Sequence, residues 1–329
     1  MSNFANRYVA LVKETTYGTD PSSGYKYGEV DDESMQHNFE LLTRQDMSRY
    51  GSSQSNTGKE YSEGDVNMAL MADDFSCLVV SGIYNTNANS SGTHTFTEAG
   101  TDRSFTMKVG REEQEHTYTG VVVDSISINA SMNEYATMSA SFLGQSEGAI
   151  ASLATPTFPN GEDALYFSNA KVFFNNHADA SANVKSISLD ISVNRDGDNA
   201  CALGSDTYVR LPPKQRMEIT GTIEFNKIIH SHAEHEPTYA QLKSTDGHEV
   251  NPTGAAEYAI RLQFGDESTA DKFTIDLFKV RYEAPSASVS GRDTQTVSVG
   301  FVALFDDEGS TPANAMSKIV IKNDTNATY

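Results

Sequence analysis

Apolar and small polar residues alternate along much of the chain. In the clearest stretch, 125–132, Ile126 and Ile128 fall on one face, while Ser125, Ser127 and Asn129 fall on the other. A period of two residues predicts a β-strand with one buried face. The stretch 135–142 alternates in the same way after a short polar connection, so the two segments predict an antiparallel hairpin.

The same alternation predicts strands throughout the sequence. They are expected at 7–13, 35–42, 65–71, 103–109, 166–174, 184–193, 217–225, 257–264, 273–282, 295–305 and 317–322. One short helix is expected at 72–80, with Asp73 and Asp74 in its first turn and Phe75, Leu78 and Val79 on one face. Together these elements predict an all-β protein.

Comparison of the chain with itself indicates an internal repeat. Residues 59–68 align with 216–225 at an offset of 157, and 136–143 align with 295–302 at an offset of 159. A third match, 39–42 with 189–192, has an offset of 150. We therefore predict two tandem β domains, 1–154 and 155–329. Each domain is expected to carry a long polar loop, at 43–60 and 196–214.

The charge balance restricts the possible partners. The 329 residues include 45 acidic and 24 basic side chains, for a net charge of -21, and no stretch concentrates Lys or Arg. This argues against tight nucleic-acid binding. Cys77 and Cys201 match no zinc or disulfide spacing, which favours free thiols in an intracellular setting. The apolar stretches are too short to span a bilayer and no secretory signal opens the chain, so no membrane partner is expected.

Only one cluster resembles a catalytic or metal-binding motif. His230, His232, Glu234 and His235 are similar to the ligand string of metallo-β-lactamase-fold hydrolases. Only His248 follows, and the flanking sequence predicts strands alone, so a solvated turn is the better interpretation. The chain has no nucleophile elbow, phosphate-binding loop or dinucleotide fingerprint. We predict no enzyme activity, no catalytic residues, no cofactor and no metal.

Both ends of the chain resemble one family of viral proteins. The opening, 8–21 (YVALVKETTYGTDP), is similar to the start of major tail tube proteins of long-tailed, non-contractile (siphovirus-type) viruses. The strand entry at 63–66 and the closing segments 296–307 and 316–323 also resemble that family. The resemblance implies a structural virion protein that polymerises into stacked rings, the tail tube through which the genome passes into the host.

The resemblance also implies an architecture and a set of partners. In the family each tube domain is a small β-sandwich or barrel with a flanking helix, its inner sheet joins those of its neighbours, and six domains close a ring. Two domains per chain then imply a homotrimer with a pseudo-sixfold ring. The expected partners are a tape-measure protein, a tail terminator and baseplate or distal tail proteins. The expected location is the virion tail, assembled in the host cytoplasm.

Two sets of residues are candidates for these roles. The long loop contacts the adjacent ring in the family, and the residues expected to do so here are Arg44, Arg49, Tyr50, Lys59, Tyr208 and Arg210. Small polar residues opposite the core face are expected to line an acidic lumen that does not bind passing DNA: Asp65, Asn67, Ser125, Ser127, Asn129, Thr222, Glu224, Thr296 and Ser298. The alternatives are a two-domain β-sandwich adhesin or virion decoration protein, and a zinc hydrolase using His230, His232 and His235.

Overall fold

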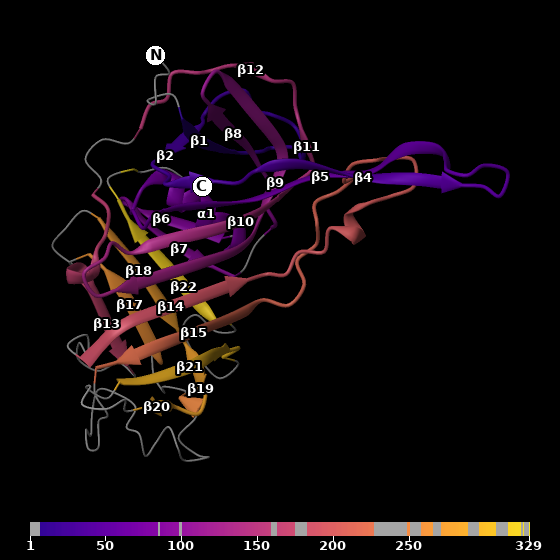
Figure 1. Ribbon diagram of the computed structural model, residues 1–329. Coiled ribbons are helices and arrows are strands. Elements are labelled where there is room, and N and C mark those ends of the chain that lie inside the picture. Colours follow the sequence, from indigo (N-terminus) through magenta and orange to yellow (C-terminus); the bar gives the residue numbers. More distant parts are fainter. Residues whose placement is uncertain are drawn as a thin grey trace.

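A computed structural model gives the fold. It describes residues 7–84, 86–98, 101–158, 163–174, 183–226, 249–250, 258–265, 271–288, 296–306, 315–323, 325 and 329. Within these residues nearly all regular structure is β, as the sequence predicts, and the strands form two antiparallel sheets (Figure 1).

The larger sheet has sixteen strands and contains most of the chain. They are β1 (Tyr8–Lys13), β2 (Lys26–Gly28), β3 (Asp32–Glu33), β4 (Gln36–Gln45), β5 (Ser52–Ala69), β8 (Phe105–Arg111), β9 (Gln114–Ser131), β10 (Thr137–Gly144), β11 (Ser146–Glu147), β12 (Ala151–Ser152), β14 (Val184–Ser192), β15 (Glu218–Phe225), β16 (Glu249–Val250), β19 (Lys279–Tyr282), β20 (Ser286–Ser288) and β21 (Thr296–Leu304). Its main path runs β16-β19-β21-β15-β14-β9-β10-β5-β3. The predicted β9–β10 hairpin is confirmed, with Met138 opposite Ile128.

The smaller sheet lies behind β14 and β15 in the view of Figure 1. Its order is β13-β17-β18-β22-β7-β6. The bounds are β6 (Thr86–Ser90), β7 (Thr93–Thr97), β13 (Ala170–Phe174), β17 (Ile260–Phe264), β18 (Lys272–Leu277) and β22 (Ser317–Lys322), and the two described 3-10 turns are η2 (Phe167–Asn169) and η4 (Asp198–Ala200). The β6–β7 hairpin was missed by the sequence analysis. Its polar strands meet at Ser91 and Gly92, which both have positive φ, as the tight turns of hairpins require.

One hydrophobic core lies between the elements of both sheets. Alternate residues of β9, β10, β14 and β21, such as Ile128, Met138, Leu189 and Val299, are buried in a single contiguous cluster. Because side chains alternate across a strand, this burial leaves the opposite face of the same strands to polar residues.

Two strand pairs cross the predicted boundary between residues 154 and 155. β9 pairs with β14 over seven positions, Ser186↔Ser131 to Ser192↔Ser125. β22, near the end of the chain, pairs with β7 from the first half. Strands of both halves therefore contribute to both sheets, and the division into two domains stays a prediction.

The helix α1 (Asp74–Ile83) confirms the helix predicted at 72–80 and extends three residues further. Asp73 is its N-cap, and the carboxylate accepts a hydrogen bond from the Ser76 amide at 2.8 Å. At its C-terminus, Arg195 donates to the Gly82 carbonyl and Lys214 donates to that of Ile83. These two cations satisfy carbonyls that a helix leaves unpaired and complement its dipole. The described residues of the second half contain no α-helix, so the second flanking helix that the family resemblance implies stays a prediction.

The opening motif forms a buried hydrogen-bonded turn. The Glu14 carboxylate, 7% exposed, accepts bonds from the Gly18 and Gly120 amides, both at 2.8 Å, and from the hydroxyls of Ser104 and Thr106. Gly18 has a φ of +72°, a conformation that favours glycine. The motif thus links the segment after β1 to β8 and β9.

Candidate functional site

All nine residues predicted to line a lumen lie on one face of the larger sheet. The strand registers form continuous rows, for example Asn67–Ser139–Ser127–Asp190–Thr220 across β5, β10, β9, β14 and β15. The other predicted residues occupy neighbouring rows through the pairs Asp65↔Ser141, Ser141↔Ser125, Ser188↔Asn129, Ser188↔Thr222, Glu224↔Ser298 and Ser288↔Thr296. We call this surface the polar face. Its role as a lumen stays a prediction.

Hydroxyl groups and carboxylates pair across the polar face. Ser141 donates to Asp65 and Ser127 donates to Asp190, each at 2.5 Å. Glu224 accepts a bond from Lys185 at 2.9 Å, and this interaction lowers the pKa of the glutamate. The face therefore presents carboxylates that are bound by hydroxyl groups or, at Glu224, by a lysine.

β14 contributes the centre of this face, which was not predicted from the sequence. Ser186, Ser188, Asp190 and Ser192 point the same way as the predicted residues of β9. Their alternation with buried Ile187, Leu189 and Ile191 is as regular as that of β9, so the same reasoning would have found them.

The segment 43–60 is a β-ribbon, so the prediction of an irregular loop there was wrong. β4 and β5 continue past the body of the sheet as a hairpin, paired as far as Gln45↔Ser52, and project from it as an arm (Figure 1). Most arm residues are solvent-exposed on both faces, so they lack the apolar alternation that would have indicated strands. We refer to residues 39–58 as the arm.

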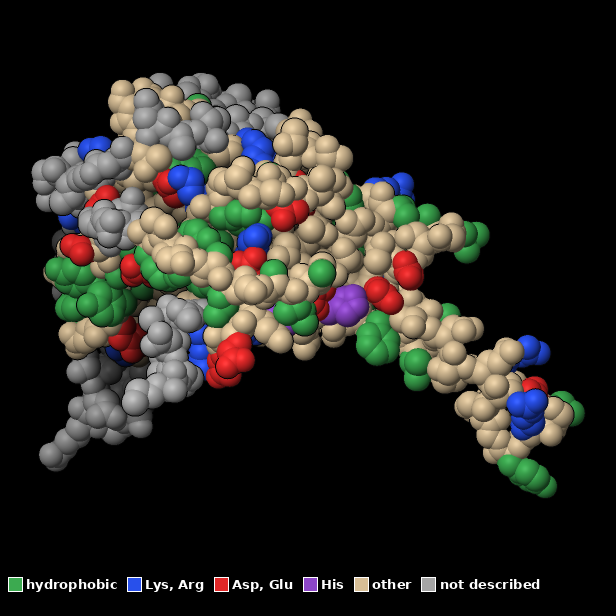
Figure 2. Space-filling model, turned by 90° about the horizontal axis from the view of Figure 1, so that it is seen from above, with side chains coloured by type: hydrophobic (Ala, Val, Ile, Leu, Met, Phe, Trp, Pro, Cys, Tyr) green, Lys and Arg blue, Asp and Glu red, His purple; other side chains and the backbone are tan. Residues whose placement is uncertain are grey.

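The arm carries three of the predicted stacking residues in its distal part. Arg44 is near the end of β4, and Arg49 and Tyr50 lie in the connecting turn. Figure 2 shows basic and apolar side chains at the end of the projecting arm. The large apolar residues of the arm are strongly exposed: Phe39, Leu41, Leu42, Met47 and Tyr50.

The other three predicted stacking residues form contacts within the chain. Lys59 binds Asp198 at 2.8 Å and lies over the rings of Tyr61 and Tyr208. Tyr208 is only 2% exposed, and its burial raises its pKa to about 12. Arg210 donates to the Asn199 carbonyl of its own segment at 2.9 Å. Residues 196–214 therefore support the base of the arm.

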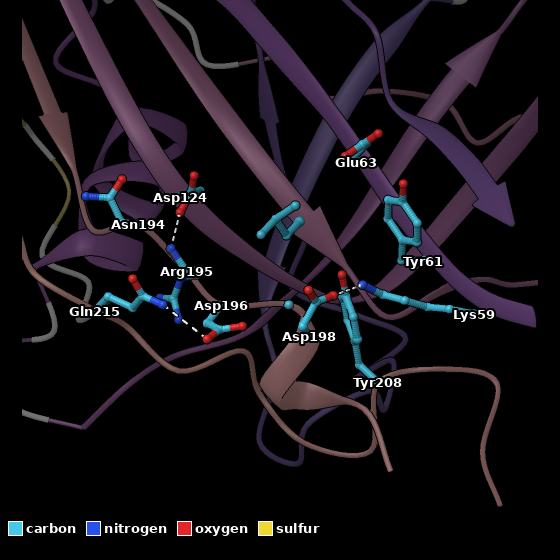
Figure 3. Close-up of a pocket in the computed structure, with 12 residues that line it drawn as sticks. Lys59, Tyr61, Glu63, Asp124, Asn194, Arg195, Asp196, Asp198, Tyr208 and Gln215 are labelled. Atoms are coloured by element: carbon cyan, nitrogen blue, oxygen red, sulfur yellow. Dashed lines mark hydrogen bonds and ion pairs between the residues drawn. The ribbon is translucent and has the colours of Figure 1, made fainter. Parts of the chain in front are cut away.

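An open hollow of about 520 Å³ lies where the arm leaves the sheet (Figure 3). Its lining includes Lys59, Tyr61, Glu63, Asp124 and Asp198 from both halves. Its charged groups are mostly engaged: Lys59 with Asp198, the Asp124 carboxylate with the Arg195 amide, and Asp196 with Gln215. The hollow is therefore lined by acidic side chains that are mostly bound to neighbouring groups.

Beneath the hollow, a buried ion pair joins the two halves. The Arg195 guanidinium donates twice to Asp102, at 3.0 and 3.1 Å, and to the carbonyls of Val123 and Pro212. Lys214 contacts the same carboxylate at 3.1 Å. Arg195 and Asp102 are 93 positions apart, so no local motif could have revealed this pair.

The described residues include no group of three His, Cys, Asp or Glu side chains arranged to hold a metal ion. His230, His232 and His235 lie outside the described residues. Within the described part of the chain, no helix is both long and apolar enough to cross a membrane.

The fold and these surfaces define an all-β protein with an extended polar face and a projecting arm that exposes apolar side chains. A family model described as phage tail tube protein matches residues 5–303, and the chain belongs to that family. No curated protein matches the chain. Family membership makes it a structural protein of a phage tail tube and not an enzyme, and it implies self-assembly and contact with other tail proteins. The adhesin and zinc hydrolase alternatives are not favoured.

Proposed function

We propose that three copies of this chain close a ring with pseudo-sixfold symmetry, and that stacked rings form the genome conduit of a siphovirus-type tail. The observation that carries this proposal is a repeated strand order. The first half pairs β1-β8-β9-β10-β5-β4. The second half pairs β13-β17-β18. β18 then runs on into β19, and the order continues as β19-β21-β15-β14.

The register of the repeated strands supports a duplication. Asp65 pairs with Ser141 in the first half. Thr222, at an offset of 157 from Asp65, pairs in the same way with Gly300, at an offset of 159 from Ser141. Gln36 of β4 pairs with Glu63, and Asp190 of β14 pairs with Thr220, which lies at the offset of 157 from Glu63. The register of β4 and β14 therefore favours an offset of 154 between these two strands. The sequence alignment of 39–42 with 189–192 is therefore out of register by four residues.

The junction between the halves is a template for the junction between chains. Inside the chain, β9 of one half pairs with β14 of the other and continues the sheet without a break. The strands equivalent to β9 and β14 are β19–β20 and β4, which lie near the two ends of the sheet. Pairing these ends between three copies would complete the ring and satisfy the backbone groups of edge strands. The polar face would then line the lumen.

Electron microscopy and mass measurement of the purified protein test this proposal. We expect negatively stained tubes or stacked rings, and single rings with the mass of three 35.8 kDa chains. Rings of six chains would contradict the pseudo-sixfold arrangement, and persistent monomers would contradict ring formation altogether. In the virion we propose that the tube binds a tape-measure protein, a terminator and distal tail proteins after assembly in the host cytoplasm.

A further inference from the structure

Exposed apolar side chains gather at two places on the described surface that are far apart in the fold. One is the arm, where five large apolar residues are 57–114% exposed. The other is formed by Met132, Tyr135, Tyr166 and Phe167, which are 39–63% exposed and which we call the acceptor patch. Two such sets on one chain indicate surfaces that become covered on assembly.

The acceptor patch is a ladder of rings beside a groove. Tyr135 packs edge-on against Tyr166 with ring centres 6.3 Å apart, and Tyr166 packs in the same way on Phe167 at 6.2 Å. The groove, of about 220 Å³, is lined mainly by apolar atoms of residues that include Ala130, Met132, Phe167, Val172, Val184 and Ile187. Its size and lining fit one or two large apolar side chains.

The arm and the acceptor patch lie at opposite ends of the same strands. β5 runs from the arm to Ala69, which pairs with Thr137, and Thr137 pairs with Asn129 near the end of β9. The patch begins at Met132, directly after β9. At the other end of these strands, Ser62 pairs with Gly144 where the arm begins. When copies stack head to tail, the arm of one copy therefore points to the patch end of the next.

The two arginines of the arm are opposite in charge to two exposed carboxylates of the patch. Arg44 and Arg49 form no ion pair within the described part of the chain. Glu134, which precedes Tyr135, and Asp163, three residues before Tyr166, are exposed and likewise form none among the described residues. Lys185, at the edge of the groove, is neutralised by Glu224. The arm thus presents Arg44 and Arg49 together with the carboxylates of Glu40 and Asp46, and the patch presents two anions, on a chain that is otherwise strongly acidic.

We propose that the acceptor patch is the docking site for the arm of a second copy in the adjacent ring. Met47 and Tyr50 fill the groove, and Arg44 and Arg49 approach Glu134 and Asp163. The contact joins two different surfaces, so it repeats without closing and produces a filament. This inference rests on the proposed tube and adds the surface that receives the arm.

Charge substitutions in the patch test the inference. Met132→Glu with Phe167→Glu should abolish tubes in negative-stain images while rings of unchanged mass remain. Ile150→Glu is the matched control, because Ile150 is 55% exposed and belongs to neither surface; it should form tubes of normal length. Normal tubes from the patch variant, with the rings intact, would overturn the inference.

A charge-reversal pair tests the partner directly. Glu134→Arg with Asp163→Arg should shorten the tubes, and so should Arg44→Glu with Arg49→Glu. Combining all four substitutions should restore tube length, because the opposite charges again face each other. If both reversals shorten tubes and their combination does not rescue them, the arm docks elsewhere. Failure of the unaltered protein to form rings would instead refute the proposed function.

Discussion

Single buried residues hold together segments that are distant in the sequence. Glu14 satisfies four donors from three segments, and Arg195 joins the first half to the second through Asp102. Charged groups are rarely buried without such partners, because the loss of hydration must be offset by hydrogen bonds. Both residues therefore serve the fold that presents the polar face and the arm.

Replacement of Glu14 should destabilise the subunit. Glu14→Ala leaves the Gly18 and Gly120 amides without their acceptor in a buried turn, so we expect the free energy of unfolding to fall by about 3 kcal/mol. Urea denaturation followed by circular dichroism measures this change. Glu113→Ala, at an exposed turn, should stay within about 0.5 kcal/mol of the unaltered protein. Equal effects of the two substitutions would show that the Glu14 bonds contribute little.

The Asp102–Arg195 pair should make stability depend on pH in the acid range. Burial by itself would raise the pKa of Asp102, but the hydrogen bonds and charge of Arg195, with Lys214, outweigh it and hold the pKa below its ordinary 3.8. The carboxylate therefore stabilises the fold above about pH 3.8, and this contribution is lost as the pH falls through the lower folded value.

The variant Asp102→Asn measures that contribution. At pH 7 it should unfold with a free energy about 3 kcal/mol lower than the unaltered protein, since Arg195 remains buried without its counter-charge. The difference should shrink as the pH is lowered below 3.8 in parallel urea titrations. A difference that stays constant down to pH 2 would exclude the ion pair as its source.

At the scale of elements, the arm can be shortened without changing the sheet. Thr43 pairs with Ser55 and Leu42 with Asn56, so replacing 43–55 by Asn-Gly would close the hairpin in its existing register. We expect rings of normal mass that do not stack, because the distal arm and both arginines are removed. Size-exclusion chromatography with electron microscopy distinguishes rings from tubes. Tubes of normal length would show that the arm is dispensable.

The strands with one buried face could be predicted from sequence, and the polar ones could not. Burial of Ile126, Ile128 and their partners imposes the alternation that revealed β9 and β10. The distal arm and the β6–β7 hairpin pair through their backbones and lack a regular apolar alternation, so the pattern that predicted the first part of β4 at 35–42 did not extend to them. The nine residues of the polar face followed from alternation, whereas the support of the arm by Tyr208 depends on a contact between segments.

At the scale of the whole molecule, the polar face extends across the junction between the halves. Its rows pass from β5 to β15 through the β9–β14 pair, and its carboxylates include Asp65, Asp190 and Glu224. In the proposed tube these groups repeat around and along the channel. Such a surface repels the phosphates of a passing genome and offers no sites to retain it.

Cations added to this face should slow genome passage without preventing assembly. Asp65 and Thr222 are exposed and occupy equivalent positions in the proposed repeat, and Asp65 forms no ion pair among the described residues, whereas Glu224 is bound to Lys185. Asp65→Lys with Thr222→Lys should leave stability and tube length nearly unchanged, because exposed charges contribute little to either. Each ring would then present phosphate-binding sites to the genome, so triggered ejection from virions should slow most at low salt and recover as salt is raised. Virions with Glu113→Lys, which adds a cation at an exposed turn off this face, should eject normally. If the double variant also ejects at the normal rate at low salt, the polar face does not line the channel.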